Sequence, residues 1–239
     1  MTVFDLRTVR QVSRISVGTN PDAMVYEPTT RRVFTFNGGS HDASVIDAAT
    51  GVLAHTLPLG GKLEFAVADG QGHVFVNIED TSELIEIDAA EPRIAARWPL
   101  APCKSPTGLA VDVARKHLFV GCSNRLMAII DAGHGRVLAT LPMGAGCDAT
   151  AFDSREGLAF AANGDGSLTV IHEDAPGKFV VVENVKTRVG ARTMALDSQR
   201  QRIYLVTAEY GPKPPATNDH LNPRRPIIPG SFTLLTLTR

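Results

Sequence analysis

The sequence has few of the residues that support metal, redox or membrane chemistry. It contains three cysteines and one tryptophan in 239 residues, and no CxxC or HExxH motif that would hold zinc. No apolar run approaches the roughly 20 residues that cross a bilayer, and the opening residues MTVFDLRTVRQ do not form a signal peptide. We therefore expect no membrane insertion and no bound cofactor.

An excess of charge of either sign is also lacking. The formal net charge is -1 and the pI is about 6.7, and the 24 basic side chains are scattered apart from Arg224 and Arg225. A nucleic acid or an anionic membrane is therefore not an expected partner. The hydrophobic content of 44% and charged content of 21% are typical of a globular protein.

Helix signals are nearly absent, and in their place one unit of about 42 residues recurs along the whole chain. The residues that close the third strand of each unit mark the repeat, with intervals between 41 and 43 residues: Asp5, Asp47, Asp88, Asp131 and His172. Each full unit shows four short strands with alternating apolar residues between turn residues. A period of this length with four strands per unit predicts an all-β propeller of four-stranded blades.

Three short motifs carry a resemblance to a known family. The segments FTFNG, VIDAATG and FAANG resemble the bacterial YVTN repeat, whose members include YncE-like propellers. The resemblance implies a propeller that is typically seven-bladed and typically exported to the periplasm or cell surface. It implies no reaction, because fold alone does not confer chemistry.

The repeat register divides the single predicted domain into complete and partial blades. Residues 1–18 form a partial blade, residues 21–61, 63–100, 106–143 and 147–185 form complete blades, and residues 191–239 form a partial last blade. These units supply 21 strands, fewer than seven four-stranded blades require. We therefore expect Met1 to be an internal or misassigned start, with about 80 residues missing, including any signal peptide. The resulting open arc would have bare, aggregation-prone edges.

Antiparallel order places two kinds of connection at one end of every blade: the one between the second and third strands, and the one leading into the next blade. We call this end the connector face and the opposite end, with its short hairpins, the turn face. Five equivalent side chains begin the innermost strands at the connector face: Asp22, Glu64, Thr107, Asp148 and Arg192. This collar would hold a cation or a small polar ligand. Alternatively, each side chain bonds the backbone of a neighbouring blade, or Arg192 forms a salt-bridge network with the carboxylates.

A second set of residues ends the second strands at the same face. Asn37 and Asn163 belong to it, with Ile78, Cys122 and Thr207 at the equivalent positions. Both asparagines precede glycine, so their first interpretation is local backbone bonding. Their position at the connector face keeps a ligand role open.

The cysteines are placed by the repeat register. Cys103 directly precedes the first strand of its blade and Cys122 ends the second strand, so antiparallel pairing brings them together. The register predicts a Cys103–Cys122 disulfide, which favours an oxidising compartment. Cys147 would remain a free, inert thiol, because no histidine is placed to act as its base.

Repeated acids and aromatic residues have structural interpretations. An acid follows the first strand in every unit, and we expect it to accept backbone N–H groups in an Asx-type turn: Glu27, Asp69, Asp112, Asp153 and Asp197. The aromatic residues of the second and fourth strands are expected in the packing between blades: Phe34, Phe75, Phe119, Phe160 and Trp98.

The Pro-rich insertion, residues 209–230, departs from the repeat. Its six prolines would stiffen an extended loop between the second and third strands of the last blade, at the connector face. It would cover the channel or present Tyr210, His220, Arg224 and Arg225 to a partner. The alternative is a disordered surface excursion.

Three classes of function follow from these features. The leading prediction is a non-enzymatic scaffold that binds a protein partner or a small polar ligand on the connector face, because no catalytic triad or metal cluster is visible. The alternative is a lactonase-like hydrolase with Ca²⁺ or Zn²⁺ held by Asp22, Glu64, Asp148, Asn37 and Asn163. A quinoprotein or electron-transfer scaffold is the third class. The sequence does not identify the partner or the ligand.

Overall fold

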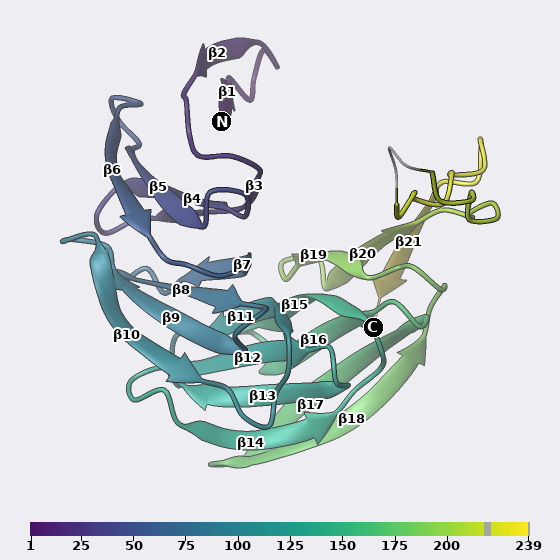
Figure 1. Ribbon diagram of the computed structural model, residues 1–239. Coiled ribbons are helices and arrows are strands. Elements are labelled where there is room, and N and C mark those ends of the chain that lie inside the picture. Colours follow the sequence, from purple (N-terminus) through teal and green to yellow (C-terminus); the bar gives the residue numbers. More distant parts are fainter. Residues whose placement is uncertain (218–220, 239) are drawn as a thin grey trace.

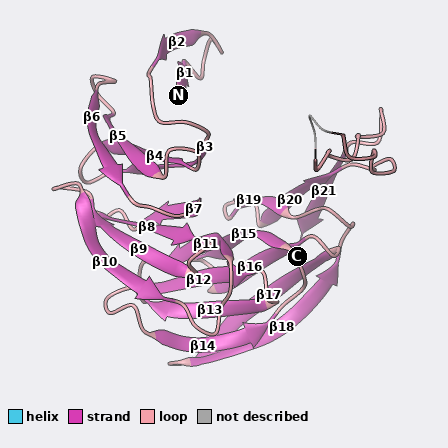
Figure 2. Cartoon of the chain, in the orientation of Figure 1, coloured by secondary structure: helices cyan, strands magenta, loops and turns pink. Residues whose placement is uncertain are grey.

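A computed structural model describes residues 1–217 and 221–238, and these residues contain strands but no helix (Figure 2). No helix of the length and apolarity needed to cross a membrane therefore occurs in this part of the chain. The N-terminal ribbon consists of β1 (Thr2–Phe4) and β2 (Gln11–Arg14), which pair antiparallel.

Four sheets of four sequential strands follow the ribbon. Blade 1 contains β3 (Pro21–Glu27), β4 (Arg32–Asn37), β5 (Asp42–Asp47) and β6 (Leu53–Pro58). Blade 2 contains β7 (Leu63–Ala68), β8 (His73–Ile78), β9 (Glu83–Asp88) and β10 (Arg93–Pro99). Blade 3 contains β11 (Pro106–Asp112), β12 (His117–Cys122), β13 (Leu126–Asp131) and β14 (Val137–Pro142). Blade 4 contains β15 (Cys147–Asp153), β16 (Leu158–Asn163), β17 (Ser167–Ala175) and β18 (Lys178–Lys186).

Blade 5 is a three-stranded sheet of β19 (Thr193–Asp197), β20 (Arg202–Thr207) and β21 (Thr233–Thr238). The blades follow one another around an arc, with the first strand of each blade innermost and the fourth outermost (Figure 1). The all-β propeller prediction is confirmed. The expectation of seven blades is not supported, because the described residues form five blades, and the ribbon and blade 5 lie at opposite ends of an open arc.

The core is divided into four clusters, one between each pair of adjacent blades. The four phenylalanines expected there are at most 8% exposed, and Trp98 packs with its ring centroid 6.1 Å from that of Phe75. The predicted use of these aromatic residues between blades is thus confirmed. Burial of both faces of the central blades explains why apolar residues fill their second and third strands.

The turn acids act as expected. In every blade the acid after the first strand accepts a backbone N–H two or three residues further on, and the shortest such N···O distances are 2.7 to 3.0 Å. These carboxylates satisfy amides that the hairpin leaves without strand partners. The Asx-type interpretation of Glu27, Asp69, Asp112, Asp153 and Asp197 is therefore confirmed.

Candidate functional site

The predicted collar lies where the innermost strands begin, and four of its five members sit in backbone irregularities. The pairing of the first with the second strand slips by at least one residue at Asp22, Glu64, Thr107 and Asp148. Such β-bulges redirect a side chain away from the regular alternation of the strand. Arg192 directly precedes β19. The bulges therefore set the direction of the collar side chains.

Glu64 belongs to a charged group on blade 2. Lys62 Nζ lies 2.9 Å from Glu64 Oε1 and also contacts Glu79 Oε2. Burial, together with the nearby Glu79 carboxylate, raises the pKa of Glu64, although Lys62 opposes the rise. Hydrogen bonds to Glu79 and Glu64 raise the pKa of Lys62. Two carboxylates thus share one ammonium group at this position.

The other collar members interact separately. Arg192 Nε lies 3.5 Å from Asp148 Oδ2 across blades 4 and 5. Thr107 donates its hydroxyl to Cys147 O of blade 4 at 2.7 Å, whereas the Asp22 side chain forms no hydrogen bond or ion pair with the other described residues. Among residues 1–217 and 221–238, no three His, Cys, Asp or Glu side chains come together to hold a metal ion. The collar as one ligand-binding set stays a prediction.

The two predicted asparagines are buried and bond within their own blades. Asn37 donates to Asp42 Oδ1 at 2.7 Å and to Ser44 Oγ at 3.0 Å. Asn163 donates to two hydroxyl groups of β17, each at 3.1 Å, and its Oδ1 is buried without a partner in the described structure. Each asparagine thus cross-links the second and third strands, and a ligand role for either stays a prediction.

A periodic hydrogen bond that the sequence interpretation missed fastens the connector face. In blades 1 to 4, a polar side chain between the second and third strands accepts a backbone N–H from the segment that enters the first strand. The acceptors are Ser40, Asp80, Asn124 and Asp165, and the N–H···O distances are 3.1, 2.8, 3.0 and 2.6 Å. We call these bonds the connector clasps. A polar residue two or three positions after the second strand in four units is the sequence signal that would have indicated these bonds.

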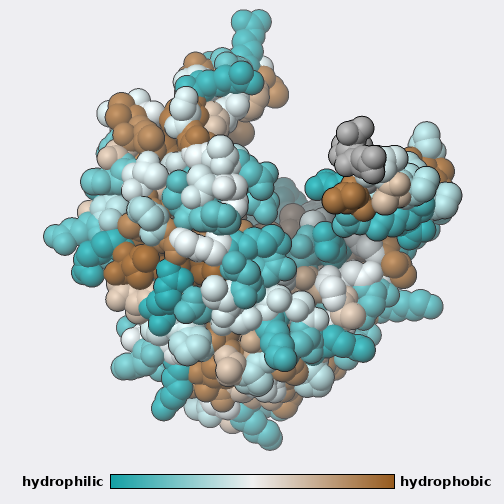
Figure 3. All heavy atoms as spheres, viewed as in Figure 1, coloured by the Kyte–Doolittle hydropathy of each residue, from teal (hydrophilic) through white to brown (hydrophobic). Residues whose placement is uncertain are grey.

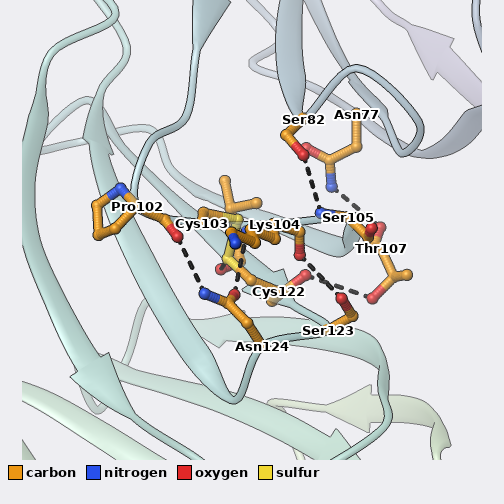
Figure 4. The surroundings of a disulfide bond; sticks show 12 residues. Asn77, Ser82, Pro102, Cys103, Lys104, Ser105, Thr107, Cys122, Ser123 and Asn124 are labelled. Atoms are coloured by element: carbon orange, nitrogen blue, oxygen red, sulfur yellow. Dashed lines mark hydrogen bonds between the residues drawn. A yellow bond between two sulfur atoms is a disulfide. The ribbon is translucent and has the colours of Figure 1, made fainter.

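In blade 3 a disulfide reinforces the clasp. Cys103 and Cys122 are bonded, with their Cα atoms 5.5 Å apart, so the predicted pairing is confirmed. Figure 4 shows Asn124 beside this bond, where it also donates to Pro102 O at 2.9 Å. The disulfide suggests a non-reducing, extracytoplasmic environment. Cys147 is free and buried, and burial raises the pKa of its thiol to about 12.

The Pro-rich insertion forms a folded projection beyond β20 and β21 (Figure 1). Tyr210 and Ile227 pair across it in an antiparallel bridge, Gly211 N donates to Pro226 O at 2.9 Å, and Ile228 N donates to Glu209 O at 2.8 Å. The base of the projection is thus a short hairpin. His220, one of its predicted partner residues, lies outside the described residues.

The turn face holds titratable groups that sequence reasoning assigned only to short hairpins. His73 Nδ1 lies 2.8 Å from Asp69 Oδ2, and its Nε2 lies 3.9 Å from Glu86 Oε1, whose carboxyl pKa is raised by burial. Between blades 3 and 4, His117 Nδ1 lies 3.7 Å from Glu173 Oε2. A histidine that begins the second strand in two units, in HVF and HLF, was the available signal.

No family model and no curated protein match the sequence. The fold is similar to the Cps50 (Swd1) β-propeller domain of Myceliophteria thermophila, with a TM-score of 0.74 and 12% identity over 87% of this chain and 73% of that chain. It is also similar to hydrazine synthase of Kuenenia stuttgartiensis, with a TM-score of 0.67 and 16% identity over 82% of this chain. The match spans 58% of that enzyme chain. At these identities the likeness shows a β-propeller fold alone.

Proposed function

We propose that the protein is a binding scaffold that takes a protein partner on its connector face, with the Pro-rich insertion as the main contact. The observation that carries this proposal is the exposure of large apolar side chains along and just after the insertion. Their exposed fractions are 46% for Tyr210, 81% for Leu221, 58% for Ile227, 42% for Ile228 and 69% for Phe232. Clustered exposed apolar groups are characteristic of interaction sites.

Charge and rigidity define the kind of partner. Arg224 and Arg225 lie among these apolar residues, and Arg225 Nε donates to Gly211 O at 2.8 Å, which holds it against the hairpin. Aromatic and arginine side chains are enriched among residues that dominate binding energy. The partner surface is therefore apolar with carboxylate groups. The backbone bonds at the base of the insertion, Gly211 N to Pro226 O and Ile228 N to Glu209 O, preorganise it, which lowers the entropic cost of binding.

Capture of a binding partner by the wild-type protein and by matched variants tests the proposal. The double variant Arg224→Glu/Arg225→Glu is compared with wild type and with Arg136→Glu/Lys178→Glu, which reverses two exposed charges on the turn face. We expect a partner from the native organism whose affinity, measured with both purified proteins, falls about tenfold or more only in the insertion variant. Equal affinities of all three proteins would reject the insertion as the contact.

The hydrolase and quinoprotein alternatives gain no supporting observation. The hydrolase would need Asp22, Glu64 and Asp148 to converge on one ion, but Glu64 pairs with Lys62 and Asp148 with Arg192. Titration with Ca²⁺ and Zn²⁺ tests this alternative directly. Stoichiometric binding that is lost in Asp148→Asn would favour the hydrolase over the scaffold.

We further propose an exported, YVTN-repeat type of propeller that works in the periplasm or at the cell surface. The 42-residue repeat supports the family assignment, and the Cys103–Cys122 disulfide supports the location. Fractionation of the native cells with thiol trapping tests this proposal. Recovery of the protein from the cytoplasm with both cysteines reduced would contradict it.

A further inference from the structure

A pocket opens on the turn face between blades 2 and 3. Its volume is about 240 Å³, which suits a ligand smaller than a typical drug molecule. Blade 2 contributes Asp69, His73 and Glu86 to its walls, whereas blade 3 contributes Val111 and Val113. Figure 3 shows a gap between the two ends of the arc, but this pocket lies between two complete blades, each of which packs on another complete blade. One wall is thus acidic and the other apolar.

Glu86 departs from the repeat. It lies opposite Phe75 in the pairing of the second and third strands. The position opposite the corresponding phenylalanine is aliphatic in the other complete blades, where it holds Val45, Ile129 and Val170. The Glu86 side chain is only 18% exposed, and its carboxylate accepts no hydrogen bond from another described residue. Burial is the main cause that raises the pKa of Glu86. A carboxylate without a donor thus takes the place of a core side chain.

His73 presents a second acceptor to the pocket. Asp69 Oδ1 accepts Gln71 N at 2.8 Å and His73 N at 3.0 Å, and Asp69 Oδ2 lies 2.8 Å from His73 Nδ1. The carboxylate places the proton of the neutral ring on Nδ1, which leaves Nε2 as an acceptor. Nε2 lies 3.9 Å from Glu86 Oε1, too far for a direct hydrogen bond. A single group with two N–H donors can reach both acceptors, because each would lie within about 3 Å of it.

Protein groups fill the equivalent positions at the neighbouring junctions. Between blades 1 and 2, Arg32 begins its strand as His73 does and donates to a backbone carbonyl of blade 2. Between blades 3 and 4, His117 begins its strand and lies 3.7 Å from Glu173 Oε2. Ala132 is the residue of blade 3 that corresponds to Glu173, since each directly follows the residue that marks its repeat. Its methyl group lines the pocket and offers His73 no polar partner.

We propose that this pocket binds a small primary amine. The ammonium group donates to Glu86 Oε1 and to His73 Nε2, and the hydrocarbon part of the ligand lies against Val111 and Val113. A charged donor stabilises a partly buried carboxylate in its ionised form, and charge-assisted hydrogen bonds are stronger than neutral ones. The pocket is on the face opposite the Pro-rich insertion, so it is independent of the partner contact proposed above.

Lys116 sets the preference for the other end of the ligand. Its side chain also lines the pocket, is exposed, and makes no hydrogen bond or ion pair with the other described residues. A second ammonium group on the ligand would be repelled by this charge, whereas a carboxylate would be attracted. We therefore expect affinity to fall from γ-aminobutyrate through n-butylamine to putrescine, three amines with the same length of carbon chain.

Calorimetric titration of the full chain with these amines tests the proposal. Glu86→Gln removes the charge at nearly constant shape and should weaken the binding of γ-aminobutyrate and n-butylamine about tenfold or more. Glu91→Gln is the matched control, because it changes an exposed acid of the same blade outside the pocket, and it should bind as wild type. Butyrate, which lacks the amine, should not bind. Undetectable binding of all three amines by the wild type at about 10 mM, where even millimolar sites are occupied, would overturn the proposal, as would equal affinities of wild type and Glu86→Gln.

A second variant separates lost recognition from a lost fold. Glu86→Ile carries the residue type that blade 3 has at this position, Ile129, and it should melt no lower than wild type because an ionisable group leaves the core. It should bind none of the amines. Amine binding that persists in this folded variant would overturn the proposal. Lys116→Ser should abolish the preference for γ-aminobutyrate over n-butylamine, and an unchanged preference would reject the contact with Lys116.

Discussion

At the scale of single residues, Glu27 shows how a repeated turn acid also joins two blades. Its carboxylate accepts hydrogen bonds from Thr29 N at 3.1 Å, from Thr30 N and Thr30 Oγ1 at 2.7 Å each, and from Gly72 N of blade 2 at 3.2 Å. Burial opposes its ionisation, but these four bonds outweigh burial and lower the pKa of Glu27. The charged form therefore stabilises both the turn and the contact between blades 1 and 2.

We predict that Glu27→Gln lowers the free energy of unfolding by about 1–3 kcal/mol at pH 7, because hydrogen bonds to a charged acceptor are lost. The contribution of a group with a lowered pKa is complete above its unfolded pKa, about 4.3, and is lost as the pH falls through the folded value. Urea unfolding between pH 7 and 3 should thus show a smaller loss of stability below pH 4.3 in the variant. Asp22→Asn is the control, and an unchanged pH dependence in Glu27→Gln would contradict the prediction.

At the scale of elements, the hairpin between β13 and β14 packs on Trp98 of β10, the one tryptophan in the sequence. Gly135 in this hairpin has φ of +68°, and a Cβ atom there would collide with the indole ring of Trp98. Gly60 has nearly the same φ, +71°, but no atom lies within 4 Å of its would-be Cβ. Substitutions at these two glycines therefore distinguish the cost of backbone strain from the cost of a packing clash.

We predict that Gly60→Ala lowers the free energy of unfolding by about 1–2 kcal/mol through left-handed strain alone. Gly135→Ala should cost about 1–3 kcal/mol more, because the ring or the hairpin must move. The emission of Trp98 should shift only in Gly135→Ala, since the protein has one tryptophan. Equal stability losses and unshifted emission in both variants would show that the hairpin does not press on the indole.

The elements also show what the sequence could predict. Turn acids and apolar alternation act locally, so the strand order and the Cys103–Cys122 pairing followed from the repeat register. The ion pair of Glu64 could not be predicted, because it depends on Lys62 and Glu79 from neighbouring segments and on a bulge that redirects the Glu64 side chain. The seven-blade expectation failed because blade number depends on how many units join, and the family pattern describes only one unit.

At the scale of the whole molecule, stability is distributed by neighbour contacts. Blades 2, 3 and 4 each share apolar clusters with two neighbours, whereas blades 1 and 5 contribute to one cluster each. No residue of the ribbon belongs to any of these clusters. In repeat architectures each unit is stabilised mainly by its neighbours, so the ends of the arc should open before its centre.

We predict that backbone amides of β8, β12 and β16 exchange hydrogen most slowly, and that those of β1, β2 and β21 exchange by local opening well below the global free energy of unfolding. Mass spectrometry of the intact chain after deuterium labelling measures this gradient. Uniform protection along the chain would mean that the arc unfolds as one unit. That result would contradict the view that each blade is stabilised mainly by its neighbours.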